Sequence, residues 1–115
     1  MTDPLWHYWV VKDGGKIVGF CIARYGEKRN ILEAIHLLLH YQGQGIGKQL
    51  LDKALNWLGR SKDIELGVSE YNNYAISFYE KFGFHKTGKS LNDEMTVLPS
   101  GRVIPQIEML LPSLK

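Results

Sequence analysis

The chain turns at Gln42-Gly43-Gln44-Gly45-Ile46-Gly47-Lys48, a glycine-dense stretch between a β-like run that ends at Leu39 and an apolar-periodic helix. Glycine lets a backbone approach a ligand and adopt conformations that are closed to other residues. The first turn of the helix adds unsatisfied N–H donors and a partial positive charge, and Lys48 adds a mobile cation. This combination is typical of a backbone cradle for a pyrophosphate. A glycine-rich connection without any ligand is the competing interpretation of the loop.

Two common nucleotide-binding loops do not fit the spacing of this stretch. A Walker loop needs Gly, four residues and then Gly-Lys-Ser/Thr, but Gln42 stands at the position of its first glycine and Gln49 at that of its hydroxyl. The dinucleotide fingerprint is Gly-x-Gly-x-x-Gly, whereas Gly43, Gly45 and Gly47 are spaced Gly-x-Gly-x-Gly. The spacing therefore argues for another kind of ligand.

The whole chain, residues 1–115, has the size and composition of one small globular domain. Its net charge of +2 suits an anionic small ligand, but without a basic stripe it does not indicate nucleic acid. No apolar run reaches the length of a membrane span, about 18 residues, and the N-terminus lacks a signal-peptide pattern. The one cysteine, Cys21, lies in an apolar run and is expected to be a buried small hydrophobe. We expect a cytoplasmic protein with no metal, no membrane and no nucleic-acid partner.

Periodicity and turn signals predict a mixed α/β domain. A strand, a helix and a second strand in the middle of the chain form a crossover that favours parallel pairing. Pro105 and Pro112 keep the last strand short or at an edge. The expected elements are a hairpin of Trp6–Lys12 and Lys16–Ala23, a strand at Ile31–Leu39, a helix at Ile46–Leu58 ended by Gly59, a strand at Ile64–Val68, a second helix capped by Asn72 or Asn73 and ended by Gly83, a short strand at Phe84–Thr87, a turn-rich loop at Leu91–Arg102 and a closing strand at Ile104–Leu111.

Two motifs, in this order, resemble those of the GNAT superfamily of acetyl-CoA-dependent N-acetyltransferases. The first, Gln42-Gly43-Gln44-Gly45-Ile46-Gly47, is similar to the family's Arg/Gln-x-x-Gly-x-Gly/Ala signature. The second, Asn72-Asn73-Tyr74-Ala75-Ile76-Ser77-Phe78-Tyr79-Glu80-Lys81-Phe82-Gly83-Phe84, resembles its Asn-x-x-Ala…Tyr…Gly-Phe helix. The resemblance covers Trp6–Leu111. It implies a GNAT-like fold with an N-terminal hairpin, two main helices and two central parallel strands that splay apart, ending at Leu39 and Val68.

The resemblance also implies that coenzyme A binds, with its pyrophosphate on the glycine loop. The pantetheine arm is an extended amide chain that can pair with an exposed strand backbone, as an added strand does. Asn72 is implied to hydrogen-bond this arm; capping its own helix is the competing role, and one residue can do both. The expected cofactor-binding residues are Leu37, Leu38, Leu39, Gln42, Gly43, Gln44, Gly45, Ile46, Gly47, Lys48, Asn72 and Tyr79.

Catalysis by direct attack of an amine on the thioester needs an acid and a base. The resemblance puts Tyr79 in the position of the general acid that protonates the leaving thiolate, and an unperturbed phenol keeps its proton until about pH 10. A core aromatic is the competing role of Tyr79. Glu33 is the expected base, on the same strand face as Ile35 and Leu37. His36, on the opposite face, and water or the substrate alone are the alternatives.

The acceptor is expected to be a primary amine of a small molecule or peptide, attacking in a ternary complex with acetyl-CoA. The acids Asp93, Glu94 and Glu108 are scattered and are expected to be solvated surface residues rather than a polycation site. The runner-up function is a non-catalytic acyl-CoA-binding module.

The start of the chain departs from the family. Most members have a strand and one or two helices before the segment that matches Trp6–Ala23, and five residues precede Trp6 here. A partner subunit that completes the acceptor cleft, an open cleft for a large substrate, and a truncated copy are the three explanations. Because proteins normally cover an exposed apolar sheet edge, we favour a homodimer.

Overall fold

The computed structural model describes residues 4–91, 96–97, 100 and 103–114, which form an α/β structure. The chain divides into two compact units, residues 1–64 with 113–115, and residues 65–112. The described elements are β1 (Trp6–Asp13), β2 (Lys16–Arg24), β3 (Asn30–Leu37), a 3₁₀ turn η1 (Leu39–Tyr41), α1 (Ile46–Leu58), β4 (Ile64–Ser69), α2 (Asn73–Glu80), β5 (His85–Ser90), β6 (Thr96–Val97), β7 (Val103–Ile104) and β8 (Gln106–Leu111).

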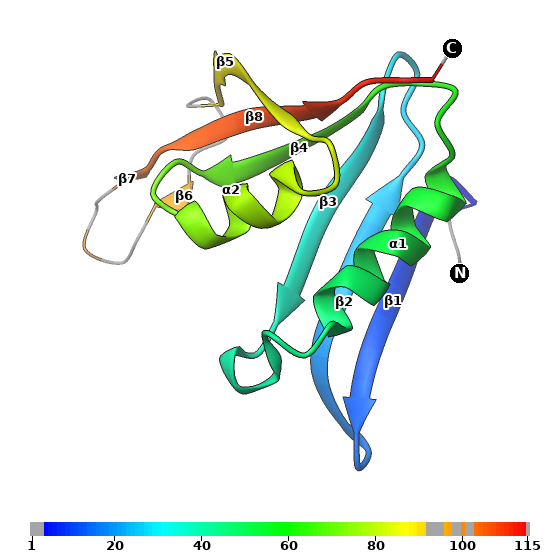
Figure 1. Ribbon diagram of the computed structural model, residues 1–115, viewed down its shortest axis with the longest axis vertical. Coiled ribbons are helices and arrows are strands. Elements are labelled where there is room, and N and C mark those ends of the chain that lie inside the picture. The colour runs from blue at the N-terminus through cyan, green and yellow to red at the C-terminus, as the bar shows by residue number, and fades with distance from the viewer. Residues whose placement is uncertain (1–3, 92–95, 98–99, 101–102, 115) are drawn as a thin grey trace. The chain divides into compact units, whose positions relative to one another are not determined.

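The first unit is an antiparallel sheet of β1, β2 and β3 with α1 across one face (Figure 1). The predicted hairpin is confirmed, and its turn uses Gly14 and Gly15 at φ values of 58° and 85°, which suit glycine. Val18 is the extra residue of a β-bulge in β2, because Val11 pairs with Gly19 and the next residue, Lys12, pairs with Ile17.

The α1 helix is held by an apolar face and by side chains that satisfy its last carbonyl groups. Tyr25 donates from its hydroxyl to the carbonyl oxygen of Trp57 at 2.6 Å, and the buried Asn30 donates from Nδ2 to that of Leu58 at 3.2 Å. An α-helix leaves its last carbonyl groups without intrahelical donors, so both bonds fix this end of α1. Gly59 then ends the helix at φ 75°, as predicted. The buried α1 side chains recur at helical spacing and are Leu50, Leu51, Ala54 and Leu58.

The second unit contains the strand order β4-β8-β5, the helix α2 and the short hairpin β6–β7 (Figure 1). Helix α2 ends at Glu80, before the predicted Gly83. Gly83 has φ 103° and Phe84 donates its backbone N–H to the carbonyl oxygen of Tyr79, so the chain turns away from the helix at this glycine. Buried side chains come from β4, α2, β8 and the residue before β5, and are Leu66, Val68, Ile76, Tyr79, Phe84, Glu108, Met109 and Leu111.

Several predicted boundaries were wrong. The third strand ends at Leu37 rather than Leu39, because Leu39–Tyr41 forms a 3₁₀ turn. The predicted closing strand is two strands, β7 and β8, separated by Pro105, which cannot donate to a strand ladder. β6 lies in the predicted turn-rich loop, of which residues 92–95, 98–99 and 101–102 are outside the described residues.

The prediction that Asp93, Glu94 and Glu108 are solvated surface residues also needs correction. Glu108 is only 3% exposed, and its Oε1 accepts a hydrogen bond from the Thr87 hydroxyl at 3.0 Å. Glu108 is therefore a buried residue of the second unit and not a solvated acid, because β8 pairs with β5 and brings Thr87 across from it. Asp93 and Glu94 are outside the described residues. The splay of the two central strands and the single domain stay predictions.

Candidate functional site

The glycine loop begins after η1 and ends at the N-terminus of α1. Gly43 has φ 78° and Gly45, the N-cap of α1, has φ 82° and ψ 0°, a left-handed conformation that favours glycine. A Cβ built on either glycine would meet no described atom within 4 Å. The first N–H groups of α1 have no intrahelical acceptor, so the loop offers donors beside a space that a ligand can enter. Lys48, in the first turn, is exposed.

The two glutamines of the loop support its backbone. Gln42 donates from Nε2 to the carbonyl oxygen of Leu37 at 3.0 Å, and Gln44 donates from Nε2 to that of His40 at 3.3 Å. The Gln42 backbone N–H also donates to the carbonyl oxygen of Leu39 at 3.1 Å. One amide donor of each glutamine is therefore used inside the protein, and the backbone N–H groups are the better candidates for ligand contacts.

The three leucines before the loop differ in the backbone groups they offer. The Leu38 N–H donates to the carbonyl oxygen of Val18 at 2.9 Å, and the Leu38 carbonyl oxygen accepts from the backbone N–H of Tyr41 at 2.9 Å. Because Leu38 is hydrogen-bonded to β2, the neighbouring pair Gly19–Leu37 is of the non-hydrogen-bonded kind, and the Leu37 N–H points away from β2. Leu37 is thus better suited than Leu38 to pair with an added extended chain. Leu39 is 82% exposed.

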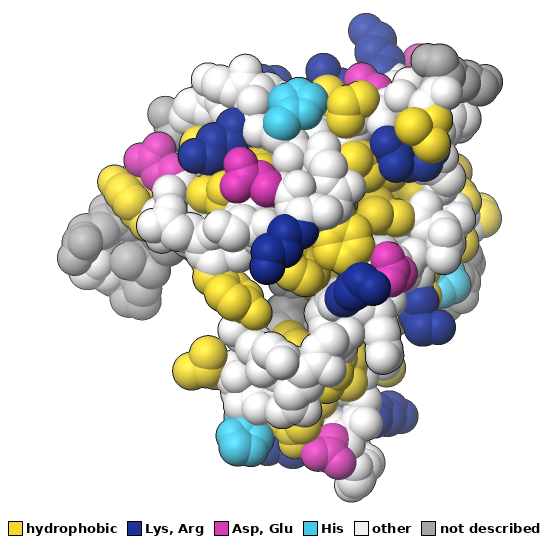
Figure 2. Space-filling view, in the orientation of Figure 1, with side chains coloured by type: hydrophobic (Ala, Val, Ile, Leu, Met, Phe, Trp, Pro, Cys, Tyr) yellow, Lys and Arg dark blue, Asp and Glu magenta, His cyan; other side chains and the backbone are white. Residues whose placement is uncertain are grey.

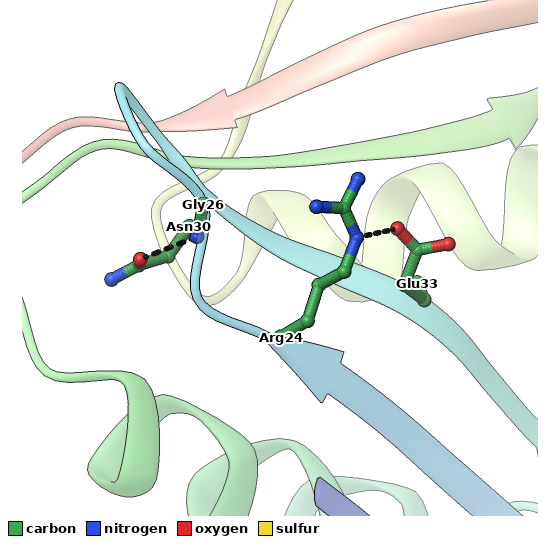
Figure 3. Close-up of polar contacts among 4 residues, drawn as sticks. All are labelled: Arg24, Gly26, Asn30 and Glu33. Atoms are coloured by element: carbon green, nitrogen blue, oxygen red, sulfur yellow. Dashed lines mark hydrogen bonds and ion pairs between the residues drawn. The ribbon is translucent and has the colours of Figure 1, made fainter. Parts of the chain in front are cut away.

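Glu33 lies at a β-bulge that the sequence pattern did not reveal. Ile22 pairs with Ala34 and the next residue, Ala23, pairs with Leu32, so Glu33 is the extra residue of β3. Its Oε1 accepts a hydrogen bond from Arg24 Nε at 2.6 Å (Figure 3). The Glu33 carboxylate therefore reaches the sheet face of Arg24.

The bulge overturns the predicted arrangement of faces on β3. Ile35 pairs with the buried Cys21, whereas His36 pairs with Phe20, and the rings of His36 and Phe20 are 5.6 Å apart. Arg24 has the same strand parity as Phe20, so Glu33 shares its face with His36 and not with Ile35. A single extra residue shifts the alternation by one position, which is the physical reason for the error.

The side chains of the Arg24–Glu33 pair are about one third exposed to solvent, 34% and 33% respectively. Arg24 also lies over the ring of Trp6, 5.4 Å from its centroid, which holds the guanidinium in place. Figure 3 shows the pair together with a second contact of β3, in which Asn30 Oδ1 accepts a hydrogen bond from the Gly26 N–H at 3.3 Å. Arg24 is a residue that sequence reasoning missed, because its partner lies on another strand.

Helix α2 carries the two predicted site residues of the second unit. Asn72 accepts a hydrogen bond from the Ala75 N–H at 3.0 Å, so it is the N-cap of α2. This bond uses the Oδ1 atom, and Nδ2 is the part of the amide that can donate to a ligand. Tyr79 is 7% exposed, and its ring packs against Phe78 and Phe84 with centroids 5.5 and 5.7 Å away. The core role considered for Tyr79 is thus present, and it holds the ring in one orientation.

Charge is mixed on the surface. Figure 2 shows Lys and Arg side chains scattered over one face with Asp and Glu among them, and no continuous basic stripe is seen on the part of that face that is described. Within the described ranges, no three His, Cys, Asp or Glu side chains are grouped as a metal site would require. No described helix is long and apolar enough to cross a membrane.

Known proteins resemble this chain in sequence and structure. The sequence model of the Acetyltransferase (GNAT) family matches residues 2–84. Peptidyl-lysine N-acetyltransferase YjaB of Salmonella typhimurium is 33% identical over 109 residues, which are 95% of this chain and 66% of that protein. Two further curated N-acetyltransferases are matched over 44% and 58% of their lengths, so this chain spans less than two thirds of these relatives.

Two solved structures illustrate the structural likeness. The ribosomal-protein-S18-alanine N-acetyltransferase from Escherichia coli has a TM-score of 0.77 at 26% identity, over 97% of this chain and 72% of that one. Arabidopsis thaliana Naa50, in complex with the bisubstrate analogue CoA-Ac-MVNAL, has a TM-score of 0.73 at 25% identity, over 90% and 70%. The predicted fold class is confirmed by these matches.

Proposed function

Because this chain belongs to the GNAT family of acetyltransferases, we propose that it transfers the acetyl group of acetyl-CoA to a primary amine. The observation that carries the proposal is the loop at the start of α1, where Gly43 and Gly45 turn the backbone at positive φ. An added Cβ at either position would meet no described atom within 4 Å, so no described atom crowds the loop on that side. The pyrophosphate of coenzyme A is an anion of the kind that backbone N–H groups at a helix N-terminus bind.

The reaction proposed is direct transfer in a ternary complex. The amine nitrogen attacks the thioester carbonyl carbon, the C–N bond forms, the C–S bond breaks, and the amine loses one proton while the thiolate of coenzyme A gains one. The backbone of Leu37 supports the pantetheine arm, since its N–H points away from β2. Nδ2 of Asn72 is a second donor for the arm, because capping occupies only Oδ1.

Tyr79 is the proposed acid. A neutral phenol can protonate a departing thiolate, and a well-placed acid contributes roughly 10²–10⁴ in rate, about 3–5 kcal/mol of barrier. The packing of its ring against Phe78 and Phe84 supports this role, because a fixed ring holds the hydroxyl in one direction.

Glu33 is the proposed base, directly or through a water molecule. A carboxylate has two oxygens, and the Arg24 bond involves Oε1. Its partial exposure leaves the group accessible to an incoming amine. His36 is the second candidate, because the bulge places it on the same face as Glu33. Glu33→Gln and His36→Gln, compared in kcat/KM at one pH, separate the two: the base is the residue whose loss lowers kcat/KM by roughly 10²–10⁴.

The acceptor class is a primary amine of a small molecule or peptide. YjaB is named as a peptidyl-lysine N-acetyltransferase and the Escherichia coli structure as a protein-alanine one, which supports testing lysine-containing and N-terminal peptides first. We also propose that the protein is cytoplasmic, that it binds no nucleic acid and that it forms a homodimer. Among the described strands β1 is the outermost of its sheet, and no Lys, Arg, Asp or Glu stands between Trp6 and Val11, which supports the homodimer.

The first test is a thermal-shift comparison of acetyl-CoA, coenzyme A, NAD and ATP. A ligand that binds only the folded state stabilises it by RT ln(1 + [L]/Kd), about 2.7 kcal/mol at a hundredfold excess over Kd. Stabilisation by the two CoA species alone is expected. Equal shifts with NAD or ATP, or no shift with acetyl-CoA, would refute the proposed cofactor.

A further inference from the structure

One hydrogen bond joins the glycine loop to the β1–β2 hairpin. Tyr41 is the residue directly before Gln42, and its hydroxyl donates to Asp13 Oδ2 at 2.7 Å across 28 residues of sequence. Asp13 ends β1 beside the two-glycine turn. Tyr41 is also held by its backbone, whose N–H donates to the carbonyl oxygen of Leu38 at 2.9 Å. The loop is therefore anchored at its entry to a separate element of the first unit.

This bond differs in kind from the other side-chain bonds of the loop. Gln42 and Gln44 bond carbonyl groups only five and four residues away, so they stabilise the local turn and can move with it. The Tyr41 bond ties the turn to β1, which is part of the sheet. Its acceptor is a carboxylate, and hydrogen bonds to an ionised acceptor are stronger than neutral ones. Hydrogen bonding to Asp13 raises the pKa of the Tyr41 phenol, so the hydroxyl keeps the proton that it donates.

We propose that Asp13 and Tyr41 form a clamp that positions the glycine loop for the pyrophosphate of coenzyme A, with Asp13 as a positioning residue. This inference rests on the proposed function. Gly43 and Gly45 leave the loop with little side-chain packing of its own, so its geometry depends on how its ends are held. Preorganisation of the N–H groups lowers the entropy lost when the ligand binds.

The sign of the effect separates this inference from simple electrostatics. Asp13 is a negative charge on an element tied to a loop that would bind an anion, so by charge alone its removal would tighten CoA binding. By positioning, the removal of Asp13 loosens the loop and weakens binding. Asp13→Asn distinguishes the two views, because it removes the charge and keeps an oxygen that accepts from the Tyr41 hydroxyl.

The experiment measures the Kd of coenzyme A and of dephospho-CoA by calorimetry for the wild type, Asp13→Ala, Asp13→Asn, Tyr41→Phe and the double variant Asp13→Ala/Tyr41→Phe. We expect Asp13→Ala and Tyr41→Phe each to raise the Kd of both ligands about three- to tenfold. The double variant should be no weaker than either single one, because both remove the same bond. Asp13→Asn should stay within about threefold of the wild type.

Three results would overturn the clamp: unchanged affinity in both single variants, tighter binding in Asp13→Ala and Asp13→Asn alike, or additive losses in the double variant. Thermal unfolding of each variant without ligand identifies any variant that fails to fold. If Asp13→Ala does not fold, Tyr41→Phe still tests the clamp, because it removes the same hydrogen bond. Failure of the proposed function looks different, since the wild type itself would then bind no coenzyme A.

Discussion

Substituting alanine for Gly45 tests whether the start of α1 binds the cofactor. Gly45 has φ 82° and ψ 0°, and its added Cβ would meet no described atom within 4 Å. The cost is therefore backbone strain and not a clash. Alanine in a left-handed conformation costs about 1–2 kcal/mol, offset by about 0.4–1 kcal/mol because the unfolded chain becomes less flexible. The expected net loss of unfolding free energy is about 1 kcal/mol, a Tm decrease of about 4 °C for a chain of this size.

The effect on coenzyme A should be much larger than the effect on stability. Relaxation of the strained residue turns the neighbouring N–H groups away from the pyrophosphate, and a hydrogen bond to a charged group contributes about 1.5–3 kcal/mol. We expect the Kd for coenzyme A to rise roughly tenfold to a hundredfold. Calorimetry at a temperature where the variant is fully folded measures this, with circular dichroism to confirm folding.

Gly59 provides the matched control at the other end of the same helix. It has φ 75° and ψ −177°, a region that is more restricted to glycine than that of Gly45, and its Cβ position is equally open. Gly59→Ala should therefore lower stability at least as much and leave the Kd unchanged. If both variants weakened coenzyme A to the same extent, or if folded Gly45→Ala bound as tightly as the wild type, the placement of the pyrophosphate would be refuted.

Three further predictions concern the acid, the helix anchor and the cysteine. Tyr79→Phe should lower kcat by roughly 10²–10⁴ while the Kd for coenzyme A changes less than threefold; full turnover on a competent amine would exclude Tyr79 as the acid. Asn30→Ala removes the hydrogen bonds to Leu58 and Gly26, so urea unfolding should show that the free energy of unfolding falls by about 2–4 kcal/mol. The control Asn56→Ala, on the exposed face of α1, should change it little. Equal losses in the two variants would contradict the anchoring role. Burial raises the pKa of Cys21 from 9.0 to about 12. The unfolded state therefore loses this proton first, and stability should be independent of the thiol below about pH 8 and decline as pH rises from 9 toward 12. A thiol reagent at pH 8 should label Cys21 only in denaturant, and labelling of the folded protein at the unfolded rate would show that the thiol is accessible.

The sequence alone determined the parts of this protein that depend on local chemistry. Positive φ at Gly43, Gly45 and Gly83 follows from the freedom of glycine, and the Asn72 cap follows from its side chain reaching a nearby N–H. Helix α1 ran as predicted, because its apolar residues repeat with the helical period. These features involve residues within one or two helical turns of each other, so their positions in the sequence specify them.

Which distant residues meet depends on how the strands pair and cannot be inferred from local sequence patterns. The bulge at Glu33 moves its carboxylate to the face of Arg24, and strand pairing buries Glu108 beside Thr87. Asp13 and Tyr41 lie 28 residues apart in the sequence, and the fold brings the Tyr41 hydroxyl to 2.7 Å from Asp13 Oδ2. Register shifts and contacts across 9 to 28 residues depend on how the strands pair, because the two-residue period of a strand changes face with a single extra residue.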